Sequence, residues 1–358
     1  MKNNYYAVIM AGGIGSRFWP VSTEKNPKQF HDILDTGESL IQRTFNRINT
    51  LVSSNNIFIS TNDRYKALVQ QQLPKISNEQ LLLEPVMRNT APCILYAALK
   101  IYEQNKDAVL LIAPSDHWID DEKKFIQNIE TSMEACAKSD ILMTLGIKPD
   151  NPNTGYGYIQ FEKSASEIKK VKQFREKPNL QTAESFLASG DFLWNAGIFV
   201  WSAKSILKAF EQHLPDMMRL FNLETPVWNT PLEKEFIEKE YQNAENISID
   251  FGILERANNV LVLPVDFGWS DLGTWGSLHK KLTKDNNDNA VVDAKAIFRN
   301  ANGNLLKTQS GKRVVIEGLD NYIVVEKDDT LLICPLASEQ HIKEITKELN
   351  EKFGKVES

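Results

Sequence analysis

The chain has 358 residues, of which 42% are hydrophobic and 25% are charged, which is ordinary for a globular protein with room for two domains. It carries 41 lysines and arginines against 47 aspartates and glutamates, so its formal net charge is −6. This balance argues against a basic nucleic-acid-binding surface and against a polybasic membrane-binding surface, while a local cationic pocket for a small anion remains compatible with it.

The three cysteines, Cys93, Cys136 and Cys334, lie far apart and form neither a CxxC pair nor a cluster with histidines. Sparse cysteines of odd number are typical of a reducing compartment, and we expect buried, inert thiols. The apolar stretch near Met1 is too short for a secretory signal, and no segment approaches the roughly 20 apolar residues of a membrane span. We therefore expect a cytoplasmic protein without nucleic-acid or membrane partners.

The first part of the chain alternates short apolar strands with longer amphipathic stretches. Wholly apolar strands in such an alternation favour an α/β fold with a Rossmann-like, mostly parallel sheet that helices cover on both faces. Ligands of such sheets bind at the carboxyl ends of the strands, so the loops after the strands are the places to search for a site. The predicted strands are residues 6–10, 57–60, 80–83, 108–113 and 141–146, and the predicted helices are residues 40–51, 65–72, 91–104 and 122–137.

The second part of the chain has a different pattern. Strand candidates at residues 158–161, 171–176 and 197–201 have little helix between them, which indicates a mixed-sheet insertion, and a further strand is predicted at 260–264. The polar run from 280 to 289 predicts a boundary between a catalytic domain, 1–280, and a small β-rich domain, 281–358. The small domain has strand candidates at 290–299, 313–317, 321–326 and 330–334 and a charged helix at 338–352.

The loop after the first predicted strand is rich in glycine and carries two positive charges. It reads Gly12-Gly13-Ile14-Gly15-Ser16-Arg17-Phe18-Trp19-Pro20 and continues to Pro27-Lys28-Gln29-Phe30. Glycines let backbone N–H groups approach an anion, and Arg17 and Lys28 add charges suited to phosphate. Phe18 breaks a dinucleotide fingerprint, no P-loop lysine is present, and the prolines oppose a helix here. The loop is predicted to wrap a phosphate chain as an extended arm; the alternative is a tight turn with solvated charges.

Two aspartates follow predicted strands. Asp116 lies in Ala113-Pro114-Ser115-Asp116-His117, and Asp271 lies in Trp269-Ser270-Asp271-Leu272-Gly273-Thr274-Trp275. Two carboxylates together with substrate phosphate oxygens are a common Mg²⁺ arrangement. The alternatives are that Asp116 caps the next helix and that Asp271 is an aspartate of a surface loop. We expect a structural role for His117 rather than that of a base.

These motifs resemble those of the sugar-nucleotide pyrophosphorylase family. Gly-Gly-x-Gly-x-Arg-x-x-Pro followed by Pro-Lys-Gln-Phe is similar to the family signature, and the Lys-Gln-Phe ending resembles its mannose-1-phosphate guanylyltransferases. The resemblance covers about residues 6–276. It implies a GT-A-like nucleotidyltransferase fold, catalytic roles for Arg17, Lys28, Asp116 and Lys177, nucleotide binding at Gly12, Gly13 and Gly15, and Mg²⁺ held by Asp116 and Asp271.

The loop after the third predicted strand reads Glu84-Pro85-Val86-Met87-Arg88-Asn89-Thr90-Ala91-Pro92. As a simple capping segment it would place Asn89 or Thr90 at the start of a helix and leave Glu84 in solvent. Guanine presents N–H donors beside an acceptor, so its recognition needs an acceptor and a donor together. The loop resembles the guanylyltransferase version, which implies that Glu84, Arg88, Asn89 and Thr90 bind the nucleotide and that the nucleotide is GTP.

Three later segments would be turn or surface sequences by themselves and gain meaning from the resemblance. Gly157 stands at the family position where backbone N–H groups approach the sugar. The resemblance further implies that Lys177 binds the phosphate of a sugar 1-phosphate and that Glu176 binds a sugar hydroxyl. Asn195, in Trp194-Asn195-Ala196-Gly197, is implied to bind sugar hydroxyls, although Ala196 replaces the frequent serine of the family.

The reaction that the resemblance implies is transfer of GMP from GTP to α-D-mannose 1-phosphate, giving GDP-mannose and pyrophosphate by in-line attack on the α-phosphate. The attacking phosphate oxygen is already ionised, so we expect positioning and charge stabilisation to carry catalysis without a general base. The alternatives are a different sugar 1-phosphate and a silent nucleotide-sugar-binding regulatory protein. The resemblance is to short family members without an isomerase domain, in which a β-rich, sometimes β-helical, tail implies assembly into a homodimer.

Overall fold

The structure is a computed structural model that describes residues 3–221 and 227–354. The chain forms two compact units, and each unit takes residues from distant parts of the sequence. The first unit comprises the residues up to Gly12, Thr44–Ser115 and Ile119–Trp269. The second comprises Gly13–Arg43, Asp116–Trp118 and the chain from Ser270 onward. The predicted domains, 1–280 and 281–358, are contiguous stretches, whereas these units are not, because the glycine loop and Asp116 group with the C-terminal part.

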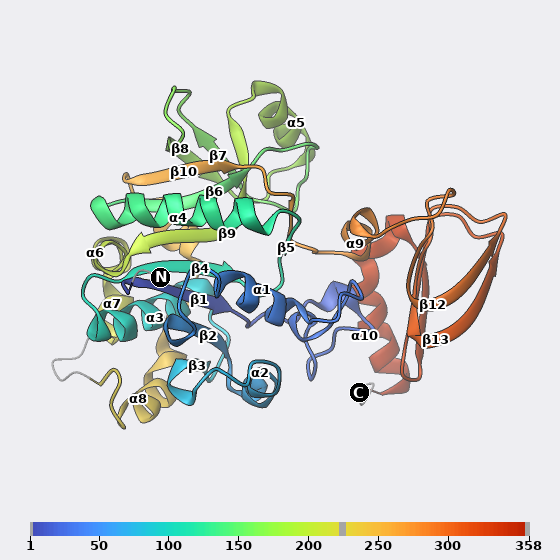
Figure 1. Cartoon of the computed structure of the whole chain (residues 1–358), viewed down its shortest axis with the longest axis horizontal. Helices are drawn as coiled ribbons and strands as arrows, with labels where there is room; N and C mark the ends of the chain where they lie inside the picture. Colours follow the sequence, from blue (N-terminus) through green and yellow to red (C-terminus); the bar gives the residue numbers. More distant parts are fainter. Residues whose placement is uncertain (1–2, 222–226, 355–358) are drawn as a thin grey trace. The chain divides into compact units, whose positions relative to one another are not determined.

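The first unit is built on a nine-stranded mixed sheet of order β3-β2-β1-β4-β9-β6-β10-β8-β7 (Figure 1). Strands β1 to β4 run parallel to one another, and β10 runs parallel to β6. The long strand β9 runs antiparallel between β4 and β6 and also pairs with β7, which makes the sheet mixed, as predicted. The strands are β1 (Tyr5–Met10), β2 (Ile57–Asn62), β3 (Leu81–Glu84), β4 (Val109–Pro114), β6 (Leu142–Ile147), β7 (Tyr158–Phe161), β8 (Lys169–Arg175), β9 (Phe192–Ser202) and β10 (Val260–Val265).

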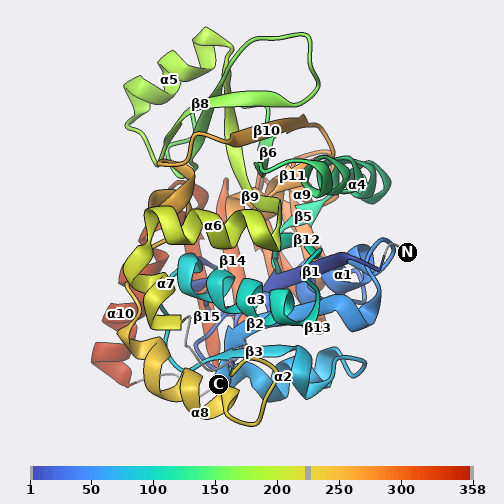
Figure 2. The same ribbon diagram turned by 90° about the vertical axis from the view of Figure 1, so that its left-hand side faces the viewer.

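Helices cover both faces of the central part of this sheet, because strands such as β1 and β4 are apolar on both sides. On one face α3 (Thr90–Gln104), α6 (Ala203–His213) and α7 (Pro215–Phe221) share an apolar core with the strands, and Figure 2 shows α3 and α6 side by side. On the other face α4 (Glu122–Lys138) packs along β4, β6 and β9. The remaining helices here are α1 (Leu40–Ile48), which ends in this unit, α2 (Lys66–Gln72), α5 (Leu180–Ser189) and α8 (Glu233–Glu240).

Two local predictions for the insertion are wrong. Little helix was expected between the strands there, yet α5 forms because the Asn179 side chain accepts a hydrogen bond from the Thr182 N–H and Gly190, with a φ of 67°, ends the helix. The strand predicted at 197–201 begins five residues earlier, at Phe192. A glycine such as Gly197, with a φ of 65°, is typical of a strand end, but here it lies inside the strand beside a register shift. Asn195 therefore lies within β9.

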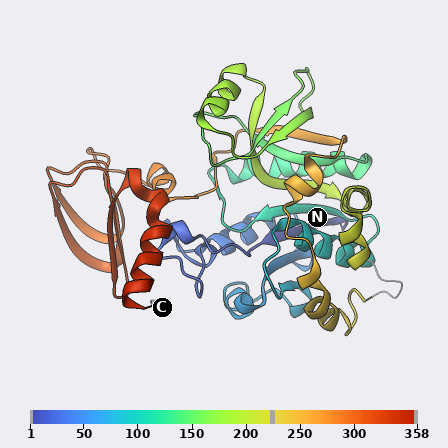
Figure 3. The ribbon, with the colours of Figure 1, turned by 180° about the vertical axis from the view of Figure 1, so that it is seen from behind.

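The second unit contains a four-stranded sheet of order β12-β13-β14-β15 and a helix on one of its faces (Figure 3). Strands β12 to β14 pair in parallel, the pairing that a β-helix uses, and β15 runs antiparallel to β14. Ile342 of the helix α10 is buried in one core with Ile323, Val325 and Leu332 of the sheet. The elements are α9 (Trp275–Lys281), β12 (Ala290–Arg299), β13 (Leu305–Glu317), β14 (Tyr322–Lys327), β15 (Thr330–Pro335) and α10 (Ile342–Phe353).

Short elements connect these parts of the chain. The glycine loop contains two 3₁₀ turns, Ser16–Phe18 and Lys28–Phe30, and no α-helix starts at its glycines, as the prolines predict. The two-residue strands β5 (Trp118–Ile119) and β11 (Trp269–Ser270) pair where the chain passes from one unit to the other. All three cysteines are buried and free of disulfides, which confirms the prediction of buried thiols. No helix in the described part of the chain is long and apolar enough to cross a membrane.

Candidate active site

The second unit gathers the predicted cationic and acidic residues around the ammonium group of Lys28. Its Nζ lies 2.8 Å from the Oδ2 atom of Asp116 and donates to the backbone carbonyls of Asp271, at 3.0 Å, and Leu272, at 2.9 Å. The side chain of Lys28 is only 3% exposed, and these three partners use all the donors of an ammonium group. Lys28 therefore holds the Asp116 strand end and the Asp271 turn together.

Two glycines make this arrangement possible. Gly15 has a φ of 70°, and a Cβ atom added there would lie 2.5 Å from the Cβ of Lys28. A Cβ atom added at Gly273 would lie 2.4 Å from the Oδ2 of Asp271, whose Oδ1 accepts a hydrogen bond from the Gly273 N–H. The positive φ and the contact with the Lys28 Cβ explain why glycine stands at position 15, whereas a larger residue at position 273 would displace the Asp271 carboxylate. At Gly13, in contrast, an added Cβ would meet no atom within 4 Å.

The electrostatics of the cluster favour an ionised Asp116. Burial alone would raise the pKa of Asp116, but the charges of Lys28 and His117 outweigh it and hold this pKa below its ordinary value. The carboxylate keeps 31% of its side chain exposed, so it remains accessible to a cation or a substrate. The helix-capping alternative is wrong for Asp116, because Asp121 caps α4 by accepting the Lys124 N–H. Arg17 is exposed and forms no ion pair with the residues that the structure describes.

In the first unit, Glu84 ends β3 and is buried beside the end of β1. Its Oε1 accepts a hydrogen bond from the Ser60 hydroxyl at 2.9 Å, and its Oε2 accepts one from the Tyr241 hydroxyl at 2.6 Å. A Cβ atom added at Gly12 would lie 4.0 Å from Oε1, so the first glycine of the loop passes over this carboxylate. Burial raises the pKa of Glu84, while the hydrogen bonds from Tyr241 and Ser60 act in the opposite sense. The alternative of a solvated Glu84 is wrong, since the residue is 7% exposed.

The rest of this loop is anchored to the segment that precedes β10. Arg88 donates to the Gln242 carbonyl at 2.6 Å, and its Nε is buried without a partner among the described residues. Asn89 occupies the N-cap position of α3, but its side chain bonds Asn246 rather than the helix. The Thr90 hydroxyl accepts the Ile249 N–H at 2.9 Å. These contacts fix the loop, with a φ of 61° at Asn89, as a rigid rim after β3.

The predicted sugar-binding residues lie together around the start of β7, the end of β8 and the first half of β9. The Asn195 N–H donates to the Gly157 carbonyl at 2.8 Å. A Cβ atom added at Gly157 would meet the Oε1 of Glu176, so a larger residue there would displace this carboxylate. Lys177 has a φ of 42°, and its Nζ lies 3.7 Å from Glu176 with 69% of the side chain exposed. Gly157, Glu176, Lys177 and Asn195 thus form one polar cluster in the first unit.

Sequence reasoning missed one member of this cluster, Asp250. Its Oδ1 accepts a hydrogen bond from the Nδ2 of Asn195 at 2.7 Å. Asp250 begins a π-helical turn, Asp250–Leu254, that carries no recognised motif. The available signal was a single aspartate inside the apolar run Ile247-Ser248-Ile249-Asp250-Phe251, because a charge in such a run usually has a buried partner. Sequence reasoning also missed Ser60 and Tyr241, the hydrogen-bond partners of Glu84, because neither residue lies in a recognised motif.

The structure therefore groups the predicted site residues into sets within each unit. The second unit brings together Gly15, Lys28, Asp116 and Asp271, with Gly13 and Arg17 on the same loop. The first unit pairs Gly12 with Glu84 and separately assembles the polar cluster of Gly157, Glu176, Lys177 and Asn195. No group of three or more His, Cys, Asp and Glu side chains among the described residues is placed to enclose a metal ion. Any cation at Asp116 and Asp271 would need further ligands from substrate or water.

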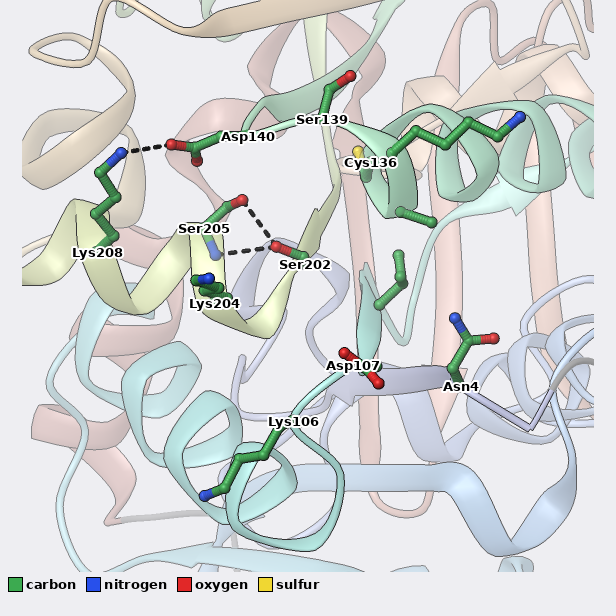
Figure 4. A pocket seen from close by; sticks show the side chains of 13 residues that line it. Asn4, Lys106, Asp107, Cys136, Ser139, Asp140, Ser202, Lys204, Ser205 and Lys208 are labelled. Atoms are coloured by element: carbon green, nitrogen blue, oxygen red, sulfur yellow. Dashed lines mark hydrogen bonds and ion pairs between the residues drawn. The ribbon is translucent and has the colours of Figure 1, made fainter.

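A separate hollow of about 550 Å³ lies at the amino ends of β1, β4 and β6 (Figure 4). Asn4, Asp107 and Asp140 line it just before these strands, and Lys208 of α6 pairs with Asp140 at 2.6 Å. Figure 4 shows this ion pair and the Ser202 hydroxyl that caps α6. Because ligands of such sheets bind at the carboxyl ends of the strands, this hollow is outside the predicted site and supplies positions for control variants.

Comparison with known proteins gives consistent matches over most of the chain. The model of the nucleotidyl transferase family matches residues 6–288. Mannose-1-phosphate guanylyltransferase of Escherichia coli is 33% identical over 98% of this chain and 76% of its own length. The enzyme of the same name from Salmonella montevideo is 36% identical over 96% of this chain and 73% of its own length. A crystal structure described as mannose-1-phosphate geranyltransferase from Thermus thermophilus is 28% identical, with a TM-score of 0.85 over 97% of this chain and 99% of that chain.

Proposed function

Because this chain belongs to the nucleotidyl transferase family, we propose that it transfers GMP from GTP to α-D-mannose 1-phosphate and releases pyrophosphate. The observation that carries this proposal is the similarity, at 33% and 36% identity and over nearly the whole chain, to two relatives named for guanylyl transfer to mannose 1-phosphate. The product would be GDP-mannose. Most motifs behind the sequence prediction also lie near a strand end or in a constrained turn, whereas Pro27-Lys28-Gln29-Phe30 is buried and supports the site from within.

Guanine recognition is supported by the loop after β3. Glu84 offers carboxylate acceptors, and the rim beside it carries the donors of Arg88 and Asn89. Both oxygens of Glu84 already accept one hydrogen bond from the protein, and each keeps a second lone-pair direction. A base without N–H groups at this place would forfeit hydrogen bonds to a charged acceptor, worth roughly 1.5–3 kcal/mol each, which is how such a site discriminates between bases.

Magnesium is the cation that fits the donor set of the second unit. Asp116 is held ionised, Asp271 lies on a turn fastened to the same lysine, and no third acidic ligand among the described residues encloses the place. One or two carboxylates completed by substrate phosphates are typical of Mg²⁺ sites, whereas Ca²⁺ and Zn²⁺ sites recruit more protein ligands. We propose that Asp116 and Asp271 hold Mg²⁺. When bound, it would neutralise phosphate charge and polarise the phosphate oxygens.

The protein's own contribution is to place charges and to keep them in place. Two unit charges 4 Å apart repel by about 4 kcal/mol at an effective dielectric constant of 20, so two polyanionic substrates need cationic partners. Arg17 and Lys177 are exposed cations with long side chains, suited to bind phosphate oxygens directly. Lys28 is buried, so we propose that it acts mainly by fixing Asp116 and the Asp271 turn. A phosphate nucleophile needs no general base.

The test is a pyrophosphate-release assay with four nucleoside triphosphates and a panel of sugar 1-phosphates, each with and without Mg²⁺. GTP with mannose 1-phosphate and Mg²⁺ should give the highest kcat/KM. A different sugar with higher kcat/KM would keep the transferase but change its substrate. No release with any pair, from folded protein that binds GTP, would favour the silent regulatory alternative. Lys208→Ala, in the hollow at the opposite strand ends, should match wild type.

We also propose a homodimer and a cytoplasmic location. The four-stranded sheet exposes apolar side chains on adjacent strands, namely Ile297 on β12 and Val315 on β13, which are register neighbours. Such a surface is suited to a second copy of the chain. Sedimentation of wild type against an Ile297→Lys, Val315→Lys variant tests it, with a shift to monomer as the expected result. The three free cysteines agree with a reducing compartment.

A further inference from the structure

The side-chain amide of Asn195 is held from both sides by groups of the first unit. Its Oδ1 accepts hydrogen bonds from the Gly197 N–H at 3.1 Å and from the Thr144 hydroxyl at 3.3 Å. Its Nδ2 donates to the Oδ1 of Asp250 at 2.7 Å. The backbone of Asn195 is fixed as well, because its N–H donates to the Gly157 carbonyl at 2.8 Å. An amide with this set of partners has one orientation.

The count of donors and acceptors shows what this amide can still offer to a ligand. A primary amide has two N–H donors and a carbonyl oxygen with two lone pairs. Gly197 and Thr144 occupy both lone pairs, and Asp250 takes one N–H. The second N–H of Nδ2 has no partner among the described residues. Asn195 is therefore set to donate a hydrogen bond to a ligand oxygen and cannot accept one without giving up a protein partner.

Two groups of fixed character set this orientation, the Gly197 N–H and the Asp250 carboxylate. The Gly197 N–H can only donate and therefore selects the carbonyl end of the amide, whereas the Thr144 hydroxyl can donate or accept and selects neither end. An ionised carboxylate accepts only, so it selects the –NH₂ end of the amide and rejects the carbonyl end. If the Asn195 amide turned over, two oxygen acceptors would face each other 2.7 Å apart.

We propose that Asp250 is a positioning residue that fixes the Asn195 amide, so that its remaining N–H donates to a hydroxyl oxygen of the sugar 1-phosphate. This inference rests on the proposed function, because it takes the cluster of Gly157, Glu176 and Asn195 as the sugar subsite. It adds a residue to that subsite and a direction to the hydrogen bond. The sugar oxygen that meets Asn195 acts as an acceptor, while the Glu176 carboxylate offers the matching acceptor for a hydroxyl proton.

The surroundings of Asp250 make the orientation of the Asn195 amide sensitive to pH. Burial, followed by the charge of Glu176, raises the pKa of Asp250 from the ordinary 3.8 to about 6, and Glu255 adds to the rise. The hydrogen bond from Asn195 acts in the opposite sense. Above this pKa the carboxylate holds the –NH₂ end of the amide. Below it, the protonated acid can also donate, so the Gly197 N–H alone opposes the turned-over amide. The other charges near the group are Lys177, which pairs with Glu176, and Arg175 and Arg256, which act on Glu255.

The test compares steady-state constants of Asp250→Asn with those of wild type. We expect KM for mannose 1-phosphate to rise about tenfold, because the Asn195 amide loses the carboxylate that fixes its orientation for the hydrogen bond to the sugar. KM for GTP should stay within about twofold. The direction of the change in KM for mannose 1-phosphate distinguishes positioning from a simple effect of charge. Removing a negative charge from a site for an anion should, on charge alone, lower this KM. A KM for mannose 1-phosphate that is unchanged or lower in Asp250→Asn overturns the proposal.

A swapped variant separates positioning from structural support. Asn195→Asp with Asp250→Asn keeps the net charge and the 195–250 hydrogen bond, so the melting temperature should lie within a few degrees of wild type. It places an acceptor-only group where the sugar needs a donor, so KM for mannose 1-phosphate should stay about tenfold or more above wild type, as in Asp250→Asn. Full recovery of KM in the swapped variant would show that Asp250 is structural only and would overturn the proposal.

A measurement on wild type alone keeps the inference testable if the variants do not fold. GDP-mannose is compared with a guanosine diphosphate ester of a simple alcohol, since neither diphosphate titrates near pH 6 and both carry guanine. Between pH 7 and pH 5 the affinity for GDP-mannose should fall about tenfold relative to the alkyl ester. Equal pH dependence of the two ligands overturns the inference. If wild type does not turn over mannose 1-phosphate at all, the proposed function fails instead, and the two failures are distinct.

Discussion

The ammonium nitrogen of Lys28 lies 2.8 Å from the carboxylate of Asp116, although 88 positions separate the two residues in the sequence. The same nitrogen binds the carbonyl of Asp271, far later in the chain. A residue that sequence reasoning assigns to phosphate binding thus holds together the two aspartates assigned to the metal. Lys28 links the glycine loop to both acidic turns within the second unit.

The first prediction concerns Lys28→Met, which keeps the length of the side chain and removes its charge. We expect turnover to fall about a hundredfold or more and stability to fall by about 1–3 kcal/mol, because Asp116 and two carbonyls lose their partner. Lys28 holds the pKa of Asp116 below its ordinary 3.8. The contribution of this ion pair to folding stability is therefore present above pH 3.8 and is lost as the pH falls below that value. Urea unfolding at pH 7 and at pH 3 measures this. Lys25→Met, at an exposed position of the same loop, is the control and should change neither quantity.

The second prediction concerns the two aspartates. Asp116→Asn and Asp271→Asn should each lower turnover by about two orders of magnitude or more with the fold intact, because each removes a carboxylate from the proposed Mg²⁺ site. Circular dichroism and titration of activity with Mg²⁺ measure the two effects. Asp266→Asn, at a side chain that is 93% exposed, is the matched control. Wild-type activity and unchanged Mg²⁺ dependence in Asp116→Ala and Asp271→Ala would show that the metal assignment is wrong.

The third prediction uses the contrast between two glycines of one loop. At Gly13 an added methyl group meets nothing within 4 Å, so Gly13→Ala should melt like wild type. If phosphate approaches the backbone there, turnover should still fall about tenfold or more. At Gly15 the added methyl meets Lys28 and the φ of 70° is unfavourable, so Gly15→Ala should lose both stability and activity. Wild-type activity in Gly13→Ala would contradict phosphate binding at this glycine.

The fourth prediction concerns Glu84 and the choice of base. Glu84→Gln should lower the ratio of kcat/KM for GTP to that for ITP, which lacks the exocyclic amino group, by about tenfold. The reason is that the amide presents one acceptor and one donor where the carboxylate presents two acceptors. If both nucleotides lose the same factor, Glu84 supports Gly12 and the loop without reading guanine. Glu79→Gln, at an exposed position just before β3, is the control.

Most of the sheet and much of the site follow from the sequence, because local patterns determine them. Apolar runs bounded by polar loops predict β1 to β4, and strand ends predict where Asp116 and Glu84 lie. Glycine motifs correctly mark the close approaches at Gly15 and Gly157. These features depend on steric and hydrophobic rules that act over a few residues.

What the sequence does not reveal depends on distant contacts. That Lys28 is buried between Asp116 and Asp271 follows from three chain segments meeting, and no local pattern encodes this. The same reason hides the grouping of the glycine loop with the C-terminal part of the chain. Asp250 was missed because a single aspartate has no periodicity, and its meaning comes only from the Asn195 amide beside it.

The fifth prediction follows from the burial of Asp250 and concerns folding stability. Its pKa is raised from 3.8 to about 6 in the folded chain, so the folded state binds this proton more tightly than the unfolded state. The contribution of the protonated Asp250 to folding stability is therefore complete below pH 3.8 and is lost as the pH rises through about 6. Asp250→Asn does not titrate, so relative to wild type it should gain stability between pH 4 and pH 8, by at most about 3 kcal/mol. Urea unfolding at pH 4, 6 and 8 measures the difference, and a pH-independent difference contradicts the raised pKa. A variant that is more stable at pH 8 yet binds mannose 1-phosphate more weakly would show that the chain retains a destabilising buried carboxylate for its effect on Asn195.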